Sequence, residues 1–151
     1  MLKGGCYCGA VRYETAASPQ QRTACHCTTC RGTSGAPFVA WFSVPAGSFR
    51  FVAGEPARFR SSEQATRTFC AACGTPLTFE STGHSDKIDV TACSLEDAEQ
   101  APPIDYTYGR SRLSWVRLED ALPVYPQARP TKACWKGTAL CLHCQHPLTQ
   151  M

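Results

Sequence analysis

The sequence predicts a mainly β fold of several short antiparallel sheets with little helix, and three observations support this. The 151 residues include 11 Gly and 11 Pro, which favours many turns between short elements. Short apolar, aromatic and β-branched runs recur along the chain and are bounded by Gly, Pro or Ser. The length is typical of one domain with a single core, and no long helical pattern is present.

The predicted strands follow one another from the N-terminus to residue 92. Residues 10–15 alternate in the way that a half-buried strand does. Residues 38–44 form an apolar and aromatic run, which Pro45 ends. Shorter strands are predicted at 49–53, 65–69, 77–80 and 88–92.

One short helix is predicted after the last of these strands. Ser94 is a good capping residue, and Glu96 and Asp97 supply the acidic side chains that favour a first helical turn. Pro102 and Pro103 end any helix begun there within about two turns.

Charge and the N-terminal sequence exclude several classes of protein. A net charge of +3 without clustered Lys and Arg does not favour nucleic acid as a partner. The first residues lack the pattern of a secretory signal, and no apolar run reaches the roughly 18 residues of a membrane span. We therefore expect a soluble, cytoplasmic protein that does not contact membranes. In that compartment, 11 cysteines are better explained as metal ligands than as disulfides.

Two pairs of cysteines predict a closed zinc site. Cys6 and Cys8 form a C-x-C pair, and Cys70 and Cys73 form a C-x-x-C turn that is followed by Gly74. Each pair can chelate one ion from a tight turn, and Gly74 permits a positive φ there. Either pair alone could be buried thiols. Together they predict a structural zinc held by four thiolates.

A third group predicts an open zinc site. Cys25, Cys27 and Cys30 lie within six residues, so their sulfurs can converge on a second ion. Three protein ligands leave a free position, as a catalytic zinc requires. The alternative is a purely structural site whose fourth ligand is His26, His84 or Cys93. Since His26 lies between two ligands, it is a candidate for proton transfer or for supporting the ligands; an exposed His26 is the other alternative.

The cysteine motifs and their surroundings resemble the glutathione-dependent formaldehyde-activating enzyme family, which includes the centromere protein V group. The resemblance covers about the first 125 residues and rests on segments 4–13, 25–31, 35–38, 69–77, 88–91 and 94–97, together with Trp115 and 122–123. It implies a tent-like zinc fold related to zinc ribbons. It also implies a structural zinc on Cys6, Cys8, Cys70 and Cys73 and a catalytic zinc on Cys25, Cys27 and Cys30.

The activity that the resemblance implies is carbon–sulfur lyase chemistry on S-hydroxymethylglutathione, the adduct of glutathione and formaldehyde. A small-molecule thiol such as glutathione and an aldehyde are then the expected partners. His26 is a candidate proton donor, and Arg31 a candidate cation beside the thiolates. Arg31 and Arg67 can also pair with peptide carboxylates. The competing hypothesis is a non-catalytic, zinc-stapled binding module for a thiol ligand or a protein.

The sequence changes character near residue 130, where a Cys- and His-rich tail begins. We predict a zinc domain at 1–130 and a flexible tail at 131–151, because chain ends are poorly ordered unless tied down. The alternative is a third zinc site built from Cys134, Cys141, His143, Cys144 and His146. A chain truncated after Ala128 is expected to keep both zinc ions.

Overall fold

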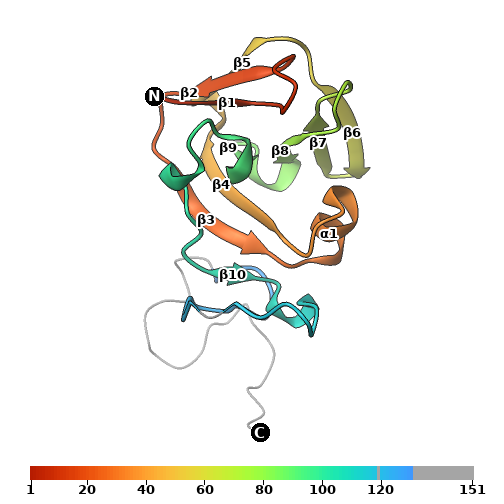
Figure 1. Ribbon diagram of the computed structural model, residues 1–151, viewed down its shortest axis with the longest axis vertical. Coiled ribbons are helices and arrows are strands. Elements are labelled where there is room, and N and C mark those ends of the chain that lie inside the picture. Colours follow the sequence, from red (N-terminus) through yellow and green to blue (C-terminus); the bar gives the residue numbers. More distant parts are fainter. Residues whose placement is uncertain (119, 131–151) are drawn as a thin grey trace, which may run out of the picture.

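The computed structural model of the chain describes residues 1–118 and 120–130, and it is mainly β, as predicted (Figure 1). A three-stranded antiparallel sheet has the order β1-β2-β5. Its strands are β1 (Leu2–Gly5), β2 (Arg12–Thr15) and β5 (Phe49–Ala53).

The second sheet has seven strands in the order β10-β3-β4-β9-β8-β7-β6. Its neighbours are antiparallel except for β10, which runs parallel to β3. The strands are β3 (Gln20–Cys25), β4 (Val39–Pro45), β6 (Ala57–Ser62), β7 (Ala65–Phe69), β8 (Pro76–Ser81), β9 (Lys87–Thr91) and β10 (Tyr106–Thr107).

Helical structure in the described residues is short. The α-helix α1 (Thr28–Ser34) connects β3 to β4. The remaining helical pieces are 3₁₀ turns: η1 (Ala46–Ser48), η2 (Thr82–His84), η3 (Ala92–Ser94), η4 (Ala98–Gln100) and η5 (Gly109–Ser111). No helix among residues 1–118 and 120–130 is both long and apolar enough to cross a bilayer.

The core lies where the small sheet packs on the large one. Tyr13 of β2 meets a cluster that includes Phe42 and Val44 of β4, Leu77 of β8 and Val90 of β9, all fully buried. Burying each such apolar side chain stabilises the fold by roughly 1.5–3 kcal/mol. The Tyr13 hydroxyl lies 2.7 Å from the Ser94 Oγ, so this buried polar group has a partner.

All six predicted strands are present, with ends that agree or shift by one or two residues. The helix predicted after Ser94 is wrong in type: the chain forms the separate 3₁₀ turns η3 and η4, and the Asp97 side chain caps the second by accepting from Glu99 N–H. Leu95 lies between the two turns in an extended conformation, which interrupts a continuous helix.

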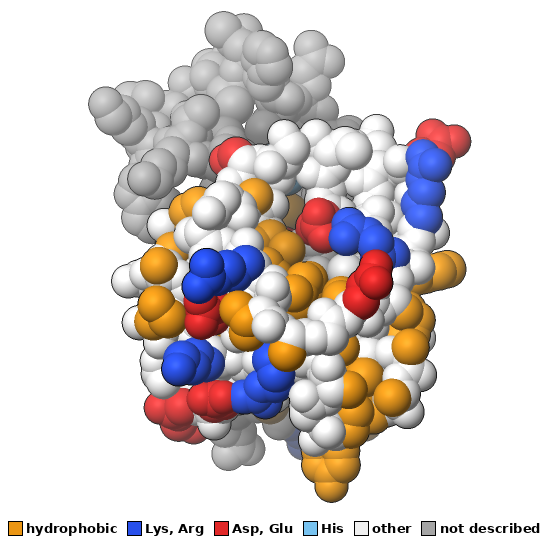
Figure 2. Space-filling model, turned by 90° about the horizontal axis from the view of Figure 1, so that it is seen from above, with side chains coloured by type: hydrophobic (Ala, Val, Ile, Leu, Met, Phe, Trp, Pro, Cys, Tyr) orange, Lys and Arg blue, Asp and Glu red, His pale blue; other side chains and the backbone are white. Residues whose placement is uncertain are grey.

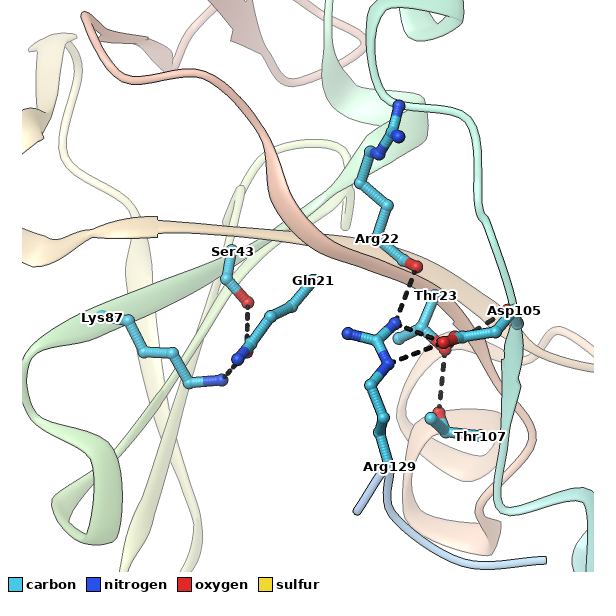
Figure 3. A network of polar contacts seen from close by, with 8 residues as sticks. All are labelled: Gln21, Arg22, Thr23, Ser43, Lys87, Asp105, Thr107 and Arg129. Carbon is cyan, nitrogen blue, oxygen red and sulfur yellow. Dashed lines mark hydrogen bonds and ion pairs between the residues drawn. The ribbon is translucent and has the colours of Figure 1, made fainter. Parts of the chain in front are cut away.

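The segment after residue 122 is tied to the large sheet beside β10 (Figure 1). Tyr106 N–H donates to the Pro123 carbonyl, and Tyr125 N–H donates back to the Tyr106 carbonyl at 2.7 Å. At the end of this segment, Arg129 Nε donates to the buried Asp105 carboxylate at 2.7 Å, and its Nη2 donates to the Arg22 carbonyl (Figure 3). A truncation after Ala128 therefore removes a structural residue, and the better end point is Pro130.

The face formed by the small sheet carries charges of both signs. Arg12 pairs with Glu96, and Arg50 of β5 pairs with Glu14 of β2. Figure 2 shows basic side chains beside acidic ones on this face, without a continuous basic patch. Such a surface lacks the electrostatic footprint of a nucleic-acid groove.

Candidate metal centres and substrate cavity

The first cysteine cluster joins two turns that are far apart in sequence. Cys6 and Cys8 lie in the turn between β1 and β2, and Cys70 and Cys73 lie in the turn between β7 and β8. The four sulfurs lie within 4.8 Å of one another. The Cys6–Cys8 and Cys8–Cys70 sulfur separations are 3.5 and 3.7 Å. Four sulfurs at 2.3 Å from a tetrahedral zinc are about 3.8 Å apart, so this donor set fits that ion.

Both turns are shaped to present sulfur to a metal. Val11 N–H donates to the Cys6 sulfur at 3.2 Å, and hydrogen bonds from the Thr75 side chain and backbone lower the pKa of Cys73 to about 5. Each turn ends in a glycine in the left-handed region: Gly9 has φ +80° and Gly74 has φ +75°. The positive φ expected at Gly74 is confirmed, because Gly adopts this region without steric cost.

The second cluster forms at the start of α1. Cys25 ends β3, Cys27 is the residue that caps α1, and Cys30 lies in its first turn. The Cys27 sulfur accepts from Cys30 N–H at 3.2 Å, in the place where a Ser or Asp oxygen usually caps a helix. The three sulfurs lie within 4.8 Å of one another, so the cluster can hold a metal ion.

The crowded sulfurs of this cluster need a cation if all three are to ionise. Hydrogen bonds from the Cys25 and Cys30 thiols lower the pKa of Cys27 to about 2. Contacts with Cys27 and Cys30 raise the pKa of Cys25, because its thiolate would lie against other sulfurs in a partly buried site. A divalent ion removes this conflict and deprotonates coordinating thiols. The chemistry of the donor set therefore fits zinc, as it does in the first cluster.

No fourth protein ligand joins the three cysteines among the described residues. His26 is fully buried and faces Phe38 and Tyr106, whose ring centroids lie 5.3 and 5.5 Å from its own. His84 is part of a separate small pocket beside Lys87. The alternative of an exposed His26 is wrong, since its ring is enclosed by aromatic side chains.

Arg67 of β7 is the cation next to this cluster. Its Nη2 lies 3.7 Å from the Cys30 sulfur, and its charge favours the Cys30 thiolate. The guanidinium carbon lies 4.8 Å from the Phe79 ring centroid and 5.8 Å from that of Trp41. Two aromatic faces thus hold a half-buried positive charge at the edge of the metal centre.

Arg67 also lines a cavity of about 500 Å³. The cavity lies between the end of α1 and strands β4, β6, β7 and β8, and it extends to Gly74 in the turn that carries Cys73. The described residues that line it are Gly32, Thr33, Ser34, Val39, Trp41, Phe59, Arg67, Thr68, Phe69, Gly74, Pro76 and Thr78. The volume lies within the roughly 300–1,000 Å³ of small-molecule sites.

Comparisons with known proteins agree with the cysteine pattern. Residues 1–111 match the family model described as glutathione-dependent formaldehyde-activating enzyme. The chain belongs to this family.

Two further proteins are similar to this family member. An uncharacterized lyase of Schizosaccharomyces pombe is 32% identical over 99 residues, which are 64% of this chain and 70% of the relative. A crystal structure of a Rhodobacter sphaeroides protein matches with a TM-score of 0.57 and 23% identity, over 70% of this chain and 99% of that one. At that identity the match supports the fold alone.

Tyr108 lies near the open cluster of this family member, and the sequence did not indicate it. Parallel pairing places Thr107 opposite Cys25, and His26 N–H donates to the Thr107 carbonyl, so Tyr108 follows directly beside the cysteine motif. Burial and the charges of the three sulfurs raise the pKa of its phenol. Its φ of +55° is uncommon for a bulky residue, and such strain clusters at functional sites.

Arg31, predicted as the cation beside the thiolates, lies in the last turn of α1. Its charge acts on His26, where burial, Arg112 and Arg31 together lower the imidazole pKa. Among the described residues, the arginine that contacts a cluster sulfur is Arg67. The tail residues Cys134, Cys141, His143, Cys144 and His146 lie outside the described residues.

Proposed function

We propose that the protein is a zinc-dependent carbon–sulfur lyase of the cytoplasm that acts on thiol–aldehyde adducts such as S-hydroxymethylglutathione. One observation carries the proposal: the two cysteine clusters differ in completeness. The first has four ligands, whereas the second has three among the described residues and adjoins a cavity through Arg67. A closed site suits a structural metal, and an open one suits catalysis.

In this proposal Cys6, Cys8, Cys70 and Cys73 hold the structural zinc, and Cys25, Cys27 and Cys30 hold the catalytic one. When bound, the catalytic zinc supplies Lewis acidity that stabilises a thiolate near neutral pH. Residues 1–130 form the catalytic domain, since the contacts of Arg129 are part of the fold.

The reaction is a reversible addition. The thiolate sulfur forms a bond to the aldehyde carbon, the carbonyl π electrons move to oxygen, and that oxygen takes up a proton. The reverse path removes the proton, breaks the carbon–sulfur bond and releases the aldehyde. Tyr108 is the proposed proton donor, because a phenol is protonated at neutral pH and this residue lies beside the cluster.

The other polar residues have supporting roles in the proposal. Arg67 offsets the negative charge of the sulfurs. His26 is neutral and enclosed, so it fixes the positions of the two cysteines that flank it rather than exchanging protons with substrate. Arg31 contributes to keeping His26 neutral.

The family description and the lyase name of the yeast relative support a glutathione-related lyase. The alternative is a zinc-stapled module that binds a thiol or a protein without chemistry. A thiol-plus-aldehyde turnover assay separates the two, with zinc-loaded wild type compared with Cys27→Ser and Cys93→Ser. Cys93 is exposed and belongs to neither cluster. Loss of turnover in Cys27→Ser but not in Cys93→Ser would support the lyase hypothesis. A wild type that binds thiols but turns over none of the adducts would contradict it.

A further inference from the structure

We propose that residues 123–129, which we call the C-terminal segment, position Tyr108 at the open cysteine cluster. The inference rests on the proposed function for the role of the Tyr108 phenol as proton donor. The match to the family model ends at residue 111, so the C-terminal segment lies beyond it. The contacts that support the inference therefore belong to a part of this chain that the family model does not describe.

Tyr108 is held by its backbone more than by packing of its side chain. The residue is 39% exposed, and its φ of +55° lies in the left-handed region. A bulky residue keeps this conformation only where the surrounding structure fixes it. The preceding strand β10 has two residues and pairs with β3 in parallel, which is a weak attachment by itself. Further backbone contacts are needed to hold Tyr108 in place.

The C-terminal segment supplies these contacts. Tyr108 N–H donates to the Gln127 carbonyl at 2.9 Å, and Gly109 N–H donates to the Tyr125 carbonyl at 2.8 Å. Tyr106, two residues before Tyr108, makes two more backbone hydrogen bonds to the same segment. The backbone on both sides of the Tyr108 side chain is therefore bonded to the C-terminal segment.

The C-terminal segment also lies too close to Gly109 for a side chain to fit there. A Cβ at this position would lie 2.5 Å from the Val124 Cγ1 and 3.2 Å from the Tyr125 carbonyl oxygen. Glycine is the residue that permits such a close approach. Since Val124 forms a parallel bridge with Tyr106, Gly109→Ala would push the segment away from β10. This substitution alters neither the ion pair of Arg129 nor a cysteine.

An ion pair anchors the far end of the C-terminal segment. Arg129 Nε donates to the Asp105 carboxylate at 2.7 Å, and its Nη2 donates to the Arg22 carbonyl of β3 (Figure 3). Asp105 directly precedes β10, so one side chain holds the segment, β3 and β10 together. Loss of this anchor should weaken the hold on Tyr108, while both cysteine clusters keep all their members.

The test measures the position of Tyr108 separately from turnover, in the zinc-loaded full chain. Fluorine NMR of protein labelled with 3-fluorotyrosine gives a signal for each of the five tyrosines. The Tyr108 signal is assigned by its absence in Tyr108→Phe. Tyr13, fully buried in the core, provides the internal reference for an intact fold. Turnover is measured with a thiol and an aldehyde on the same preparations.

The variants remove the anchor, displace the segment or restore it. They are Arg129→Ala, Arg129→Lys, Gly109→Ala, Gly109→Ala with Val124→Ala, and Arg129→Ala with Tyr108→Phe. Arg50→Ala is the matched control, because Arg50 pairs with Glu14 on the small sheet, away from β10. It should leave the Tyr108 signal and turnover unchanged.

We expect Arg129→Ala to move the Tyr108 signal toward that of free 3-fluorotyrosine and to leave the Tyr13 signal in place. Turnover should fall about tenfold, in kcat rather than in KM, because a displaced proton donor is missed in the transition state. Arg129→Lys keeps the charge and should recover part of both effects. Gly109→Ala should give the same two changes, and the added Val124→Ala should reverse them in part.

The double variant with Tyr108→Phe tests whether the segment acts through the phenol. In that background Arg129→Ala should lower turnover by less than about twofold, because the two substitutions affect one group. An equal loss from Arg129→Ala in both backgrounds would overturn the proposal. So would an unchanged Tyr108 signal in both Arg129→Ala and Gly109→Ala. If Arg129→Ala does not fold, Gly109→Ala and its combination with Val124→Ala decide the question.

The two measurements separate this inference from the proposed function. A wild type without turnover would refute the lyase, while a displaced Tyr108 signal in Arg129→Ala would still support positioning by the C-terminal segment. Full turnover in Arg129→Ala and Gly109→Ala would overturn the positioning role and leave the lyase in place.

Discussion

Arg129→Ala tests whether the segment after residue 122 is part of the domain. The Asp105 side chain is only 4% exposed, and its Oδ1 has no partner among the described residues, so Arg129 supplies the compensating charge. Removing one partner of a buried ion pair costs about 3–5 kcal/mol. The Arg129 side chain is 29% exposed, so solvent screens part of this, and we expect a loss of about 2–3 kcal/mol.

Urea unfolding of the zinc-loaded protein, followed by circular dichroism, measures this loss as a lower midpoint at unchanged slope. The control is the double variant Asp105→Asn with Arg129→Ala, in which no uncompensated charge remains. It should recover much of the loss. A midpoint equal to wild type in Arg129→Ala, or a double variant no more stable than the single one, would refute the reasoning.

Three further predictions follow from the described contacts. Cys70→Ala should lower the free energy of unfolding by about 4 kcal/mol or more, because it opens the closed metal site; a melting curve like that of wild type would contradict this. Tyr13→Phe should cost about 1 kcal/mol, since it removes the hydrogen bond to Ser94. Burial raises the pKa of Tyr13 to about 12, so the contribution of the protonated phenol to the free energy of unfolding is complete below pH 10 and declines by up to about 2.7 kcal/mol as pH rises from 10 to 12. Over that range the urea midpoint of Tyr13→Phe should fall less than that of wild type. Parallel falls in the two proteins would count against this prediction. Tyr108→Phe should lower kcat/KM roughly 100-fold with zinc content unchanged, and full turnover in this variant would exclude the phenol as proton donor.

The sequence predicts those parts of the fold that follow from local patterns. Strands β5 and β7 have the predicted bounds, because short runs at 49–53 and 65–69 are bounded by turn residues. Helix α1 was missed because Cys27 caps it with sulfur and Gly32 lies inside it, so the usual signals of a helix are absent. Strand β6 was missed because this edge strand is mostly exposed and carries charged side chains.

In the candidate site, too, the sequence predicts what local patterns specify and misses what depends on tertiary contacts. Cysteine spacing alone predicts both clusters, because chelating pairs are local patterns. The approach of Arg67 to Cys30 spans 37 residues and depends on how α1 sits against β7, so the sequence could raise Arg67 as a carboxylate partner but could not place it. Tyr108 depends likewise on the parallel pairing of the two-residue strand β10.

Zinc content per chain tests the central claim most directly. A chain ending at Pro130 should bind two zinc ions by inductively coupled plasma mass spectrometry, and its Cys27→Ser variant should bind one and keep the circular dichroism spectrum and most of the stability of the parent. Two zinc ions in the variant, or collapse of its fold to the extent expected for Cys70→Ala, would contradict the assignment of a structural and a catalytic centre.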